Sequence, residues 1–190
     1  MNKFISYVII LLTSFLLNAC SALWIPDPVD PRLPKFTETG NNVAGALVNE
    51  KIWEARTACF LVGGCNNAMK FLLNADSSLT VSLEGSVDGI DMTFNFTIKS
   101  QSFLTYSDLR LLNGKKFTID GKVNTVVVDD LSRSNTPIPC TPGVYAQGQL
   151  YFVGVKQYVY SGTFGFKIDD PSGCGNYEVS YGRFDFGLNQ

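Results

Sequence analysis

The chain has 190 residues, with 15 lysines and arginines against 17 acidic residues, a formal net charge of −2 and no histidine. Nucleic-acid binding needs clustered positive charge, which the sequence does not show, so we expect no nucleic-acid partner. The lack of histidine also excludes Ser-His-Asp and Cys-His catalytic arrangements. With no histidine and no CxxC spacing, we expect no metal site and no cofactor.

The N-terminus predicts an export signal followed by a lipid attachment site. Lys3 precedes residues 4–17, an apolar stretch of signal-peptide length that is too short for a membrane-spanning helix. The stretch ends in Leu17-Asn18-Ala19-Cys20. This end resembles the lipobox of bacterial lipoproteins, which implies removal of residues 1–19 and acylation of Cys20. The alternative is an ordinary signal peptide with a chance cysteine.

The residues after Cys20 predict where the chain is anchored and how far the domain stands from the membrane. Ser21 replaces the Asp that retains lipoproteins at the inner membrane in enteric bacteria, so we expect the outer membrane, on either its periplasmic or its surface side. Residues 21–35 contain four prolines and are typical of an extended spacer. We therefore divide the chain into a signal peptide (1–19), a lipidated spacer (20–39) and one domain (40–190).

Alternating apolar and polar residues predict an all-β domain. We expect a hairpin across Asn49-Glu50, a second across Asp88-Gly89 and a third, joining 117–119 to 123–129, across Asp120-Gly121. Two segments, 67–74 and 102–112, are candidates for short helical pieces. The C-terminal third predicts an antiparallel meander of three strands at 144–153, 157–168 and 177–188. The predicted fold is an antiparallel β-sandwich or an open, barrel-like meander, with at most one or two short helices. Trp53 is predicted to lie in its core.

Four cysteines besides Cys20 predict disulfides, because an even count in an exported chain favours bridges over free thiols. They are Cys59, Cys65, Cys140 and Cys174, and three pairings are open. We prefer Cys59–Cys65, which closes a short loop. We also prefer Cys140–Cys174, because each of these cysteines precedes a strand that we expect to start at the same end of the sheet.

The two ends of the domain resemble a group of small Bacteroidetes lipoproteins. The N-terminal match is Leu33-Pro34 followed by Thr37, Thr39-Gly40-Asn41 and, further on, Val48-Asn49 and Trp53; the C-terminal match is Gly182-Arg183-Phe184-Asp185-Phe186. Glu50 stands where these chains usually have a turn glycine, and Ala46 where they often have cysteine. The resemblance implies an anchor, a fold and a lineage, and it implies no activity.

The polar face of the C-terminal sheet is the candidate ligand site. It comprises Tyr145, Gln147, Gln149 and Tyr151 on one strand and Tyr181 and Arg183 on another. Aromatic rings beside amide and charged groups suit sugar binding, and the alternative is a solvated or loop-covered sheet face. The acid pairs Asp129-Asp130 and Asp169-Asp170 are candidates for carboxylate catalysis, and Asp169-Asp170 is also a candidate for calcium binding. The alternative is that both pairs are ordinary turn formers, because each follows a strand and precedes a loop. We predict no catalytic residue.

These features together favour a membrane-anchored, non-enzymatic binding or accessory protein of the cell envelope, with a glycan or an envelope protein as its partner. One alternative is a structural subunit of a surface assembly, in which exposed strand edges pair with partner chains. The other is an envelope hydrolase that uses carboxylates.

Overall fold

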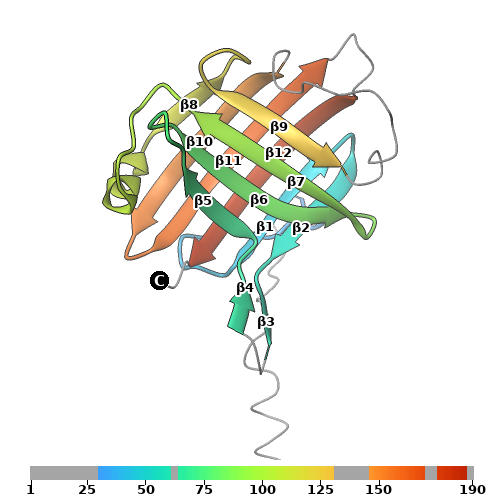
Figure 1. The fold of residues 1–190 in the computed structure, drawn as a ribbon. Helices are drawn as coiled ribbons and strands as arrows, with labels where there is room; N and C mark the ends of the chain where they lie inside the picture. The colour runs from blue at the N-terminus through green and yellow to red at the C-terminus, as the bar shows by residue number, and fades with distance from the viewer. Residues whose placement is uncertain (1–29, 61–63, 131–145, 170–174, 188–190) are drawn as a thin grey trace, which may run out of the picture.

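The structure is a computed structural model that describes residues 30–60, 64–130, 146–169 and 175–187 (Figure 1). These residues form β-strands and one 3-10 helix, η1 (Tyr106–Leu112). The strands are β1 (Val43–Val48), β2 (Lys51–Arg56), β3 (Ala58–Phe60), β4 (Gly64–Asn66), β5 (Met69–Leu73), β6 (Leu79–Val87), β7 (Ile90–Ile98), β8 (Lys116–Ile119), β9 (Thr125–Asp130), β10 (Ala146–Lys156), β11 (Val159–Asp169) and β12 (Asn176–Gly187).

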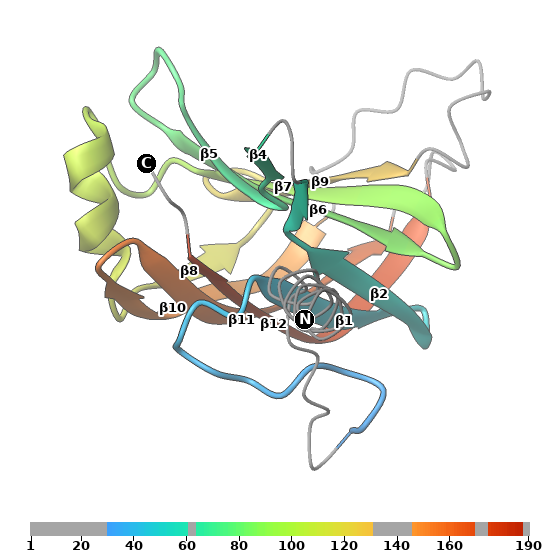
Figure 2. The ribbon, with the colours of Figure 1, turned by 90° about the horizontal axis from the view of Figure 1, so that it is seen from below.

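Ten strands form one antiparallel sheet that curls into a nearly closed barrel (Figures 1 and 2). Their order is β8-β10-β11-β12-β1-β2-β6-β7-β9, and β5 pairs with β6 beside this path. Strands β3 and β4 form a separate ribbon that projects from the barrel (Figure 1). The predicted all-β fold is confirmed, as are the C-terminal meander and the hairpins across Asn49-Glu50 and Asp88-Gly89.

The barrel interior is a packed aromatic core. In β7 and β11 every second side chain points inward, as the alternation predicts. Phe94 and Phe96 of β7 meet Phe164 and Phe166 of β11 edge to face, with ring centroids 5.5–5.8 Å apart. Such geometry is favourable for aromatic pairs. The rings fill the space between the two sides of the barrel, where an open barrel would hold a ligand.

Trp53 lies in this core, as predicted. It is fully buried, its ring centroid is 4.5 Å from that of Phe94, and its indole N–H donates to the Met92 carbonyl over 2.9 Å. Gly85 makes room for it: a Cβ at that position would lie 2.6 Å from the indole ring and 2.4 Å from the Glu54 carbonyl oxygen. The close approach of β2 and β6 thus requires glycine at position 85.

The two helical expectations need correction. Residues 67–74 do not form a helix: Met69–Leu73 is strand β5, which pairs with β6 and places Phe71 against the ring of Tyr160 at 4.7 Å. The available edge of β6 overrides a weak helical pattern. Within 102–112 only Tyr106–Leu112 is helical, as a 3-10 helix. It begins where the Asp108 carboxylate accepts the backbone N–H groups of Leu104 and Thr105.

The predicted hairpin across Asp120-Gly121 is wrong. Strand β8 pairs with β10 and β9 pairs with β7, so the two strands end up on opposite edges of the sheet. The backbone N–H groups of Asp120 and Gly121 both donate to the Asn124 carbonyl across the turn. Side chains take the next donors: Asp120 accepts the N–H groups of Lys122 and Val123, and buried Asn124 accepts those of Lys99 and Ser100. Side chains thus satisfy backbone donors that a tight hairpin would pair directly.

The Asp120 turn carries a pH prediction. Hydrogen bonds from the backbone N–H groups of Lys122 and Val123 hold the pKa of Asp120 below its ordinary value of 3.8. A lowered folded-state pKa stabilises the turn above the unfolded-state value, and that stabilisation is lost as the pH falls through the folded-state pKa. We expect a carbon-detected NMR titration to show this low pKa, with the two amide protons shifting in step. An ordinary pKa, or amides that do not move, would contradict it.

The segment 30–42 is docked on the outside of β1 and β12 (Figure 2). Leu33 is fully buried, and Pro34 lies against Gly45, where a Cβ would come within 2.4 Å of the proline ring. Asp185 faces outward and is nonetheless buried, because this segment covers it. Its carboxylate accepts hydrogen bonds from the Thr37 hydroxyl and from the backbone N–H groups of Thr39 (3.2 Å), Gly40 (2.8 Å) and Asn41 (3.1 Å).

The backbone of the β3–β4 ribbon fits one of the predicted disulfides. The antiparallel register sets Cys59 directly opposite Cys65. Directly opposed residues have Cα atoms about 4.5–5.5 Å apart, within the range of roughly 4.4–6.8 Å found across disulfides. No disulfide is present among the side chains that the structure describes, so the Cys59–Cys65 bond stays a prediction. Cys20, Cys140 and Cys174 lie outside the described residues.

Candidate functional site

The predicted ligand residues lie on the outer face of β10, β11 and β12. Gln147 and Gln149 are exposed and Tyr151 is half-buried on β10, whereas Tyr181 is 65% exposed on β12. Tyr145 lies outside the described residues. Strand β11 lies between β10 and β12. The outward residues of β11, which the prediction did not include, therefore connect the two groups.

The strand register shows which of these side chains come together. Tyr151 is opposite Thr163, which in turn is opposite Arg183, so the three form one row across the sheet. Gln149 is opposite Gly165. On the other side of Gly165 the register of β12 shifts, and Tyr181 lies in this bulge with a positive φ of 54°. Gln149 and Tyr181 thus flank Gly165 across two strand spacings, about 9.6 Å.

Gly165 leaves a hollow in this face, which we call the Gly165 hollow and define by Gln149, Tyr151, Thr163, Gly165 and Tyr181. A Cβ at position 165 would approach only one atom, the Val179 carbonyl oxygen at 3.3 Å, so the space above the glycine is open. A strand glycine without a packing neighbour commonly marks a close approach by a ligand or another backbone. The sequence signal for it was a glycine at an outward position of an alternating strand.

Neighbouring cations hold the walls of the Gly165 hollow in place. The Lys116 ammonium is 5.0 Å from the centroid of the Tyr151 ring, a cation–π distance. Arg183 donates to the carbonyl oxygens of Tyr181 (3.1 Å) and Pro34 (3.4 Å). Arg183 therefore ties the β12 bulge to the docked N-terminal segment. We assign it a positioning role in the predicted ligand face.

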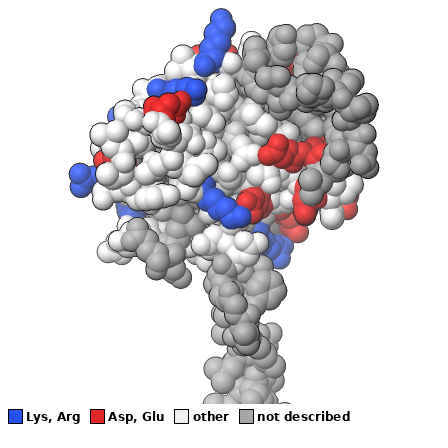
Figure 3. Space-filling model, viewed as in Figure 1, with Lys and Arg blue, Asp and Glu red and all other residues white. Residues whose placement is uncertain are grey.

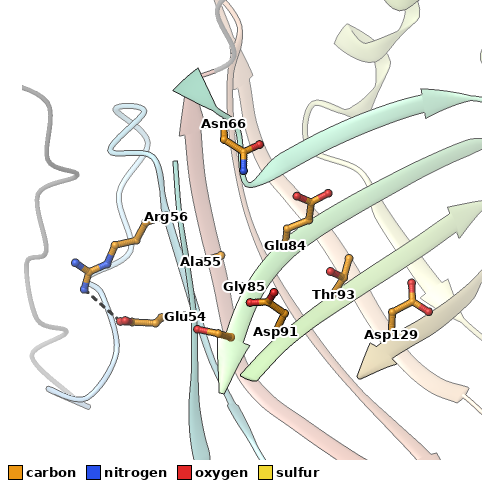
Figure 4. A pocket seen from close by; sticks show the side chains of 10 residues that line it. Glu54, Ala55, Arg56, Asn66, Glu84, Gly85, Asp91, Thr93 and Asp129 are labelled. Atoms are coloured by element: carbon orange, nitrogen blue, oxygen red, sulfur yellow. Dashed lines mark hydrogen bonds and ion pairs between the residues drawn. The ribbon is translucent and has the colours of Figure 1, made fainter. Parts of the chain in front are cut away.

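A second feature is an acidic cleft of about 480 Å³ on the outer face of β2, β6, β7 and β9 (Figures 3 and 4). Its carboxylates belong to Glu54, Glu84, Asp91 and Asp129, and they are spread along the cleft without converging on one point (Figure 4). Three of these carboxylates have side-chain partners: Arg56 pairs with Glu54 (3.2 Å), Lys70 pairs with Glu84 (2.6 Å), and the Asn95 amide donates to Asp129 (2.6 Å). Among the described residues no cluster of acids or cysteines is arranged to hold a metal ion.

The predicted acid pairs are not arranged as pairs. Adjacent residues of a strand point to opposite faces, so Asp129 lines the acidic cleft. Asp130 instead accepts the Tyr177 hydroxyl over 3.0 Å and lines a separate pocket of about 260 Å³. Asp169 forms an ion pair with Lys167 over 2.9 Å, and position 170 lies outside the described residues. Asp129 and Asp130 therefore do not face a common site.

Comparison of the chain with protein-family models, with curated proteins and with solved structures finds no match. In the part of the chain that the structure describes, no helix has the length and apolarity to cross a membrane.

Proposed function

We propose that the chain is a non-enzymatic, lipid-anchored glycan-binding protein of the bacterial cell envelope, and that the Gly165 hollow takes one sugar residue. The observation that carries this proposal is the open glycine between Gln149 on one side and Tyr181 on the other, with Tyr151 diagonally across the face. A Cβ would come within 2.2–2.4 Å of a neighbouring atom at Gly45, Gly85, Gly148, Gly162 and Gly182, whereas at Gly165 the nearest atom is 3.3 Å away.

The chemistry of the walls matches that of a sugar. A tyrosine has an apolar ring that can cover the C–H face of a pyranose and a hydroxyl that can donate or accept. The Gln149 amide offers donors and an acceptor to sugar hydroxyls, and the Thr163 hydroxyl adds another pair. The site is shallow and exposed, which suits the end or side of a longer glycan more than a small buried metabolite.

The anchor and the lineage support the envelope location. Leu17-Asn18-Ala19-Cys20 has the form of a lipobox, and Ser21 favours the outer membrane. Two or more acyl chains on Cys20 hold a protein stably at a bilayer. The resemblance to small Bacteroidetes lipoproteins rests on the segments around Thr37 and Asp185, which contact each other through the hydrogen bond of the Thr37 hydroxyl to the Asp185 carboxylate.

A glycan array with the full chain, followed by calorimetry on the best ligand, tests the proposal. We expect Tyr151→Ala and Gly165→Val each to weaken binding at least about tenfold, or ~1.4 kcal/mol, the first by removing a ring and the second by filling the hollow. Tyr106→Ala, an exposed tyrosine on η1 away from this face, is the matched control and should bind as the parent does. An array without any bound glycan, or variants that bind unchanged, would refute the site.

The assembly alternative has one specific observation in its favour. Strands β8 and β9 end the path of the sheet, and among the described residues each pairs with one neighbour. Open edges of this kind can add a strand from another chain. Cross-linking of cells followed by purification would recover a stoichiometric envelope partner if the protein is an assembly subunit, and would recover none if it acts alone.

A further inference from the structure

One end of the barrel exposes an unusual group of large apolar side chains. Leu104 is 74% exposed, Leu72 59%, Tyr106 56%, Tyr158 54% and Leu111 44%. They come from β5, from η1 and the residue pair before it, and from the β10–β11 turn. We call this group the apolar rim. Single exposed apolar residues are ordinary on protein surfaces, whereas a group of five at one end of a domain marks an interaction site.

The parts of the apolar rim are joined to one another. The Phe103 N–H donates to the Ser77 carbonyl over 2.9 Å, which ties the segment before η1 to the β5–β6 turn. The Val155 N–H donates to the Asn113 side chain over 2.9 Å, which ties the end of η1 to the β10–β11 hairpin. Figures 1 and 2 both place η1 and these two turns at the same end of the barrel.

The packing of η1 shows that its exposed leucines are not needed for folding. Leu109 and Leu112 are buried and attach η1 to the core. Leu111, between them in sequence, points away, and Leu104 precedes η1 on the same exposed side of the chain. The fold therefore already has its apolar anchors here, and Leu104 and Leu111 are exposed in addition to them.

The charge around the apolar rim identifies the kind of surface. Basic residues in the segments around the rim are Lys99, Arg110, Lys115 and Lys156, in a chain whose net charge is −2; Lys116, the next residue after Lys115, lies over the Tyr151 ring. Two acids among these segments have partners within the fold: Asp76 pairs with Lys99 over 3.4 Å, and the Asp108 carboxylate accepts backbone N–H groups. A third, Glu38 of the docked N-terminal segment, lies beside Gly154 of β10. The acidic cleft begins at Glu84, four residues along β6 from Thr80, which is the residue opposite Leu72. A basic, apolar rim is complementary to a negatively charged, apolar partner.

We propose that the apolar rim docks into the headgroup region of an anionic lipid bilayer, with its leucines and tyrosines inserted and its basic side chains against lipid phosphates. Aromatic and leucine side chains at the insertion depth and lysine or arginine at the headgroups are the combination that holds proteins at a membrane interface. Membrane docking of the apolar rim is independent of glycan binding at the Gly165 hollow and rests on the proposed function only through the Cys20 anchor. That anchor would bring the domain to the bilayer, and the rim would then set its orientation.

Fluorescence quenching of the lipid-anchored chain tests the proposal. In a Trp24→Phe background, Leu104→Trp places a reporter on the rim, and Ile52→Trp places a matched reporter at another exposed apolar position on β2. Trp53 is buried and contributes the same background to both. The vesicles are phosphatidylcholine with phosphatidylglycerol, carrying a brominated acyl chain. The Cys20 anchor brings both reporters to the same vesicle, so only docking of the rim distinguishes them.

We expect the Leu104→Trp reporter to be quenched about two- to threefold more than the Ile52→Trp reporter. Pure phosphatidylcholine, 1 M salt with its Debye length of about 3 Å, or the added charge reversal Arg110→Glu with Lys115→Glu should abolish the difference. Equal quenching of the two reporters on anionic vesicles contradicts membrane docking of the apolar rim but not lipid anchoring at Cys20. A chain that does not bind anionic vesicles at all contradicts both the docking and the anchoring.

Discussion

Replacing Asp185 with asparagine is expected to lower the free energy of unfolding by about 2 to 4 kcal/mol and to release residues 30–42 from the barrel. The buried carboxylate accepts four hydrogen bonds, and three come from backbone N–H groups whose only other partner would be water. An amide in its place turns an NH2 group toward donors. The segment 30–42 can detach from the barrel and become hydrated. The stability lost in Asp185→Asn therefore cannot exceed the free energy with which this segment docks.

Urea denaturation and limited trypsin digestion measure the two parts of this prediction. Lys35 is exposed within the docked segment, and cleavage after it should accelerate in Asp185→Asn. Asp88→Asn is the matched control: Asp88 forms an exposed ion pair with Lys51, and such pairs are worth less than about 1 kcal/mol. If the two variants are equally stable, or if trypsin cuts both at the parent rate, Asp185 does not hold the segment.

Trp53→Ala is expected to cost about 3 to 5 kcal/mol, because it removes the largest buried side chain and leaves a cavity that its neighbours can fill only partly. It also leaves the Met92 carbonyl without its indole donor. Trp53→Phe keeps a ring and should cost clearly less. Thermal and urea unfolding of the two variants are the measurements, and near-parent stability of Trp53→Ala would show that the core is not organised around this residue.

Gly85 offers a sharper check on the same packing. Gly85→Ala should be strongly destabilising in the parent, because the new Cβ meets both the Trp53 ring and the Glu54 carbonyl. In the Trp53→Ala background only the backbone contact remains, so the cost of Gly85→Ala should fall. A double-mutant cycle gives this difference directly. If Gly85→Ala costs the same stability in both backgrounds, the glycine is required only by its contact with the Glu54 carbonyl.

The apolar rim and the Gly165 hollow have consequences for each other. A domain that docks through η1 and the β10–β11 turn would leave the outer face of β10, β11 and β12, which carries Tyr151 and Tyr181, free of the docked end. That geometry suits glycans attached to the same envelope. Each proposal also supplies a control for the other. Tyr106→Ala should leave glycan binding unchanged, and Tyr151→Ala should leave membrane docking unchanged.

Local patterns in the sequence were sufficient for much of the barrel. Period-2 alternation marks β6, β7 and the C-terminal meander, because a strand with one buried face must alternate. The turn at Asp88-Gly89 was also predictable, since both residues adopt the positive φ that Asp and Gly tolerate. Lipid attachment at Cys20 is likewise a matter of local sequence, and the described residues neither add to it nor contradict it.

The errors arose where a partner strand decided the outcome. Residues 67–74 became a strand because they pair locally with β6, and the Asp120 turn failed to make a hairpin because β8 pairs with β10 and β9 pairs with β7. The partners of β8 and β9 lie outside any short window of sequence around that turn. Strand pairing is non-local, so its energy depends on what the rest of the sheet presents.

The sequence by itself determined an all-β chain with Trp53 in its core and a polar face that carries Tyr151 and Tyr181, and it predicts export and lipid attachment at Cys20. Only the tertiary structure decided that β11 joins the two halves of this face and that Gly165 hollows it. It also showed that Asp185, in the C-terminal strand, holds the N-terminal segment in place. The physical reason is that a side chain's neighbours across a sheet are set by register, which the whole barrel determines.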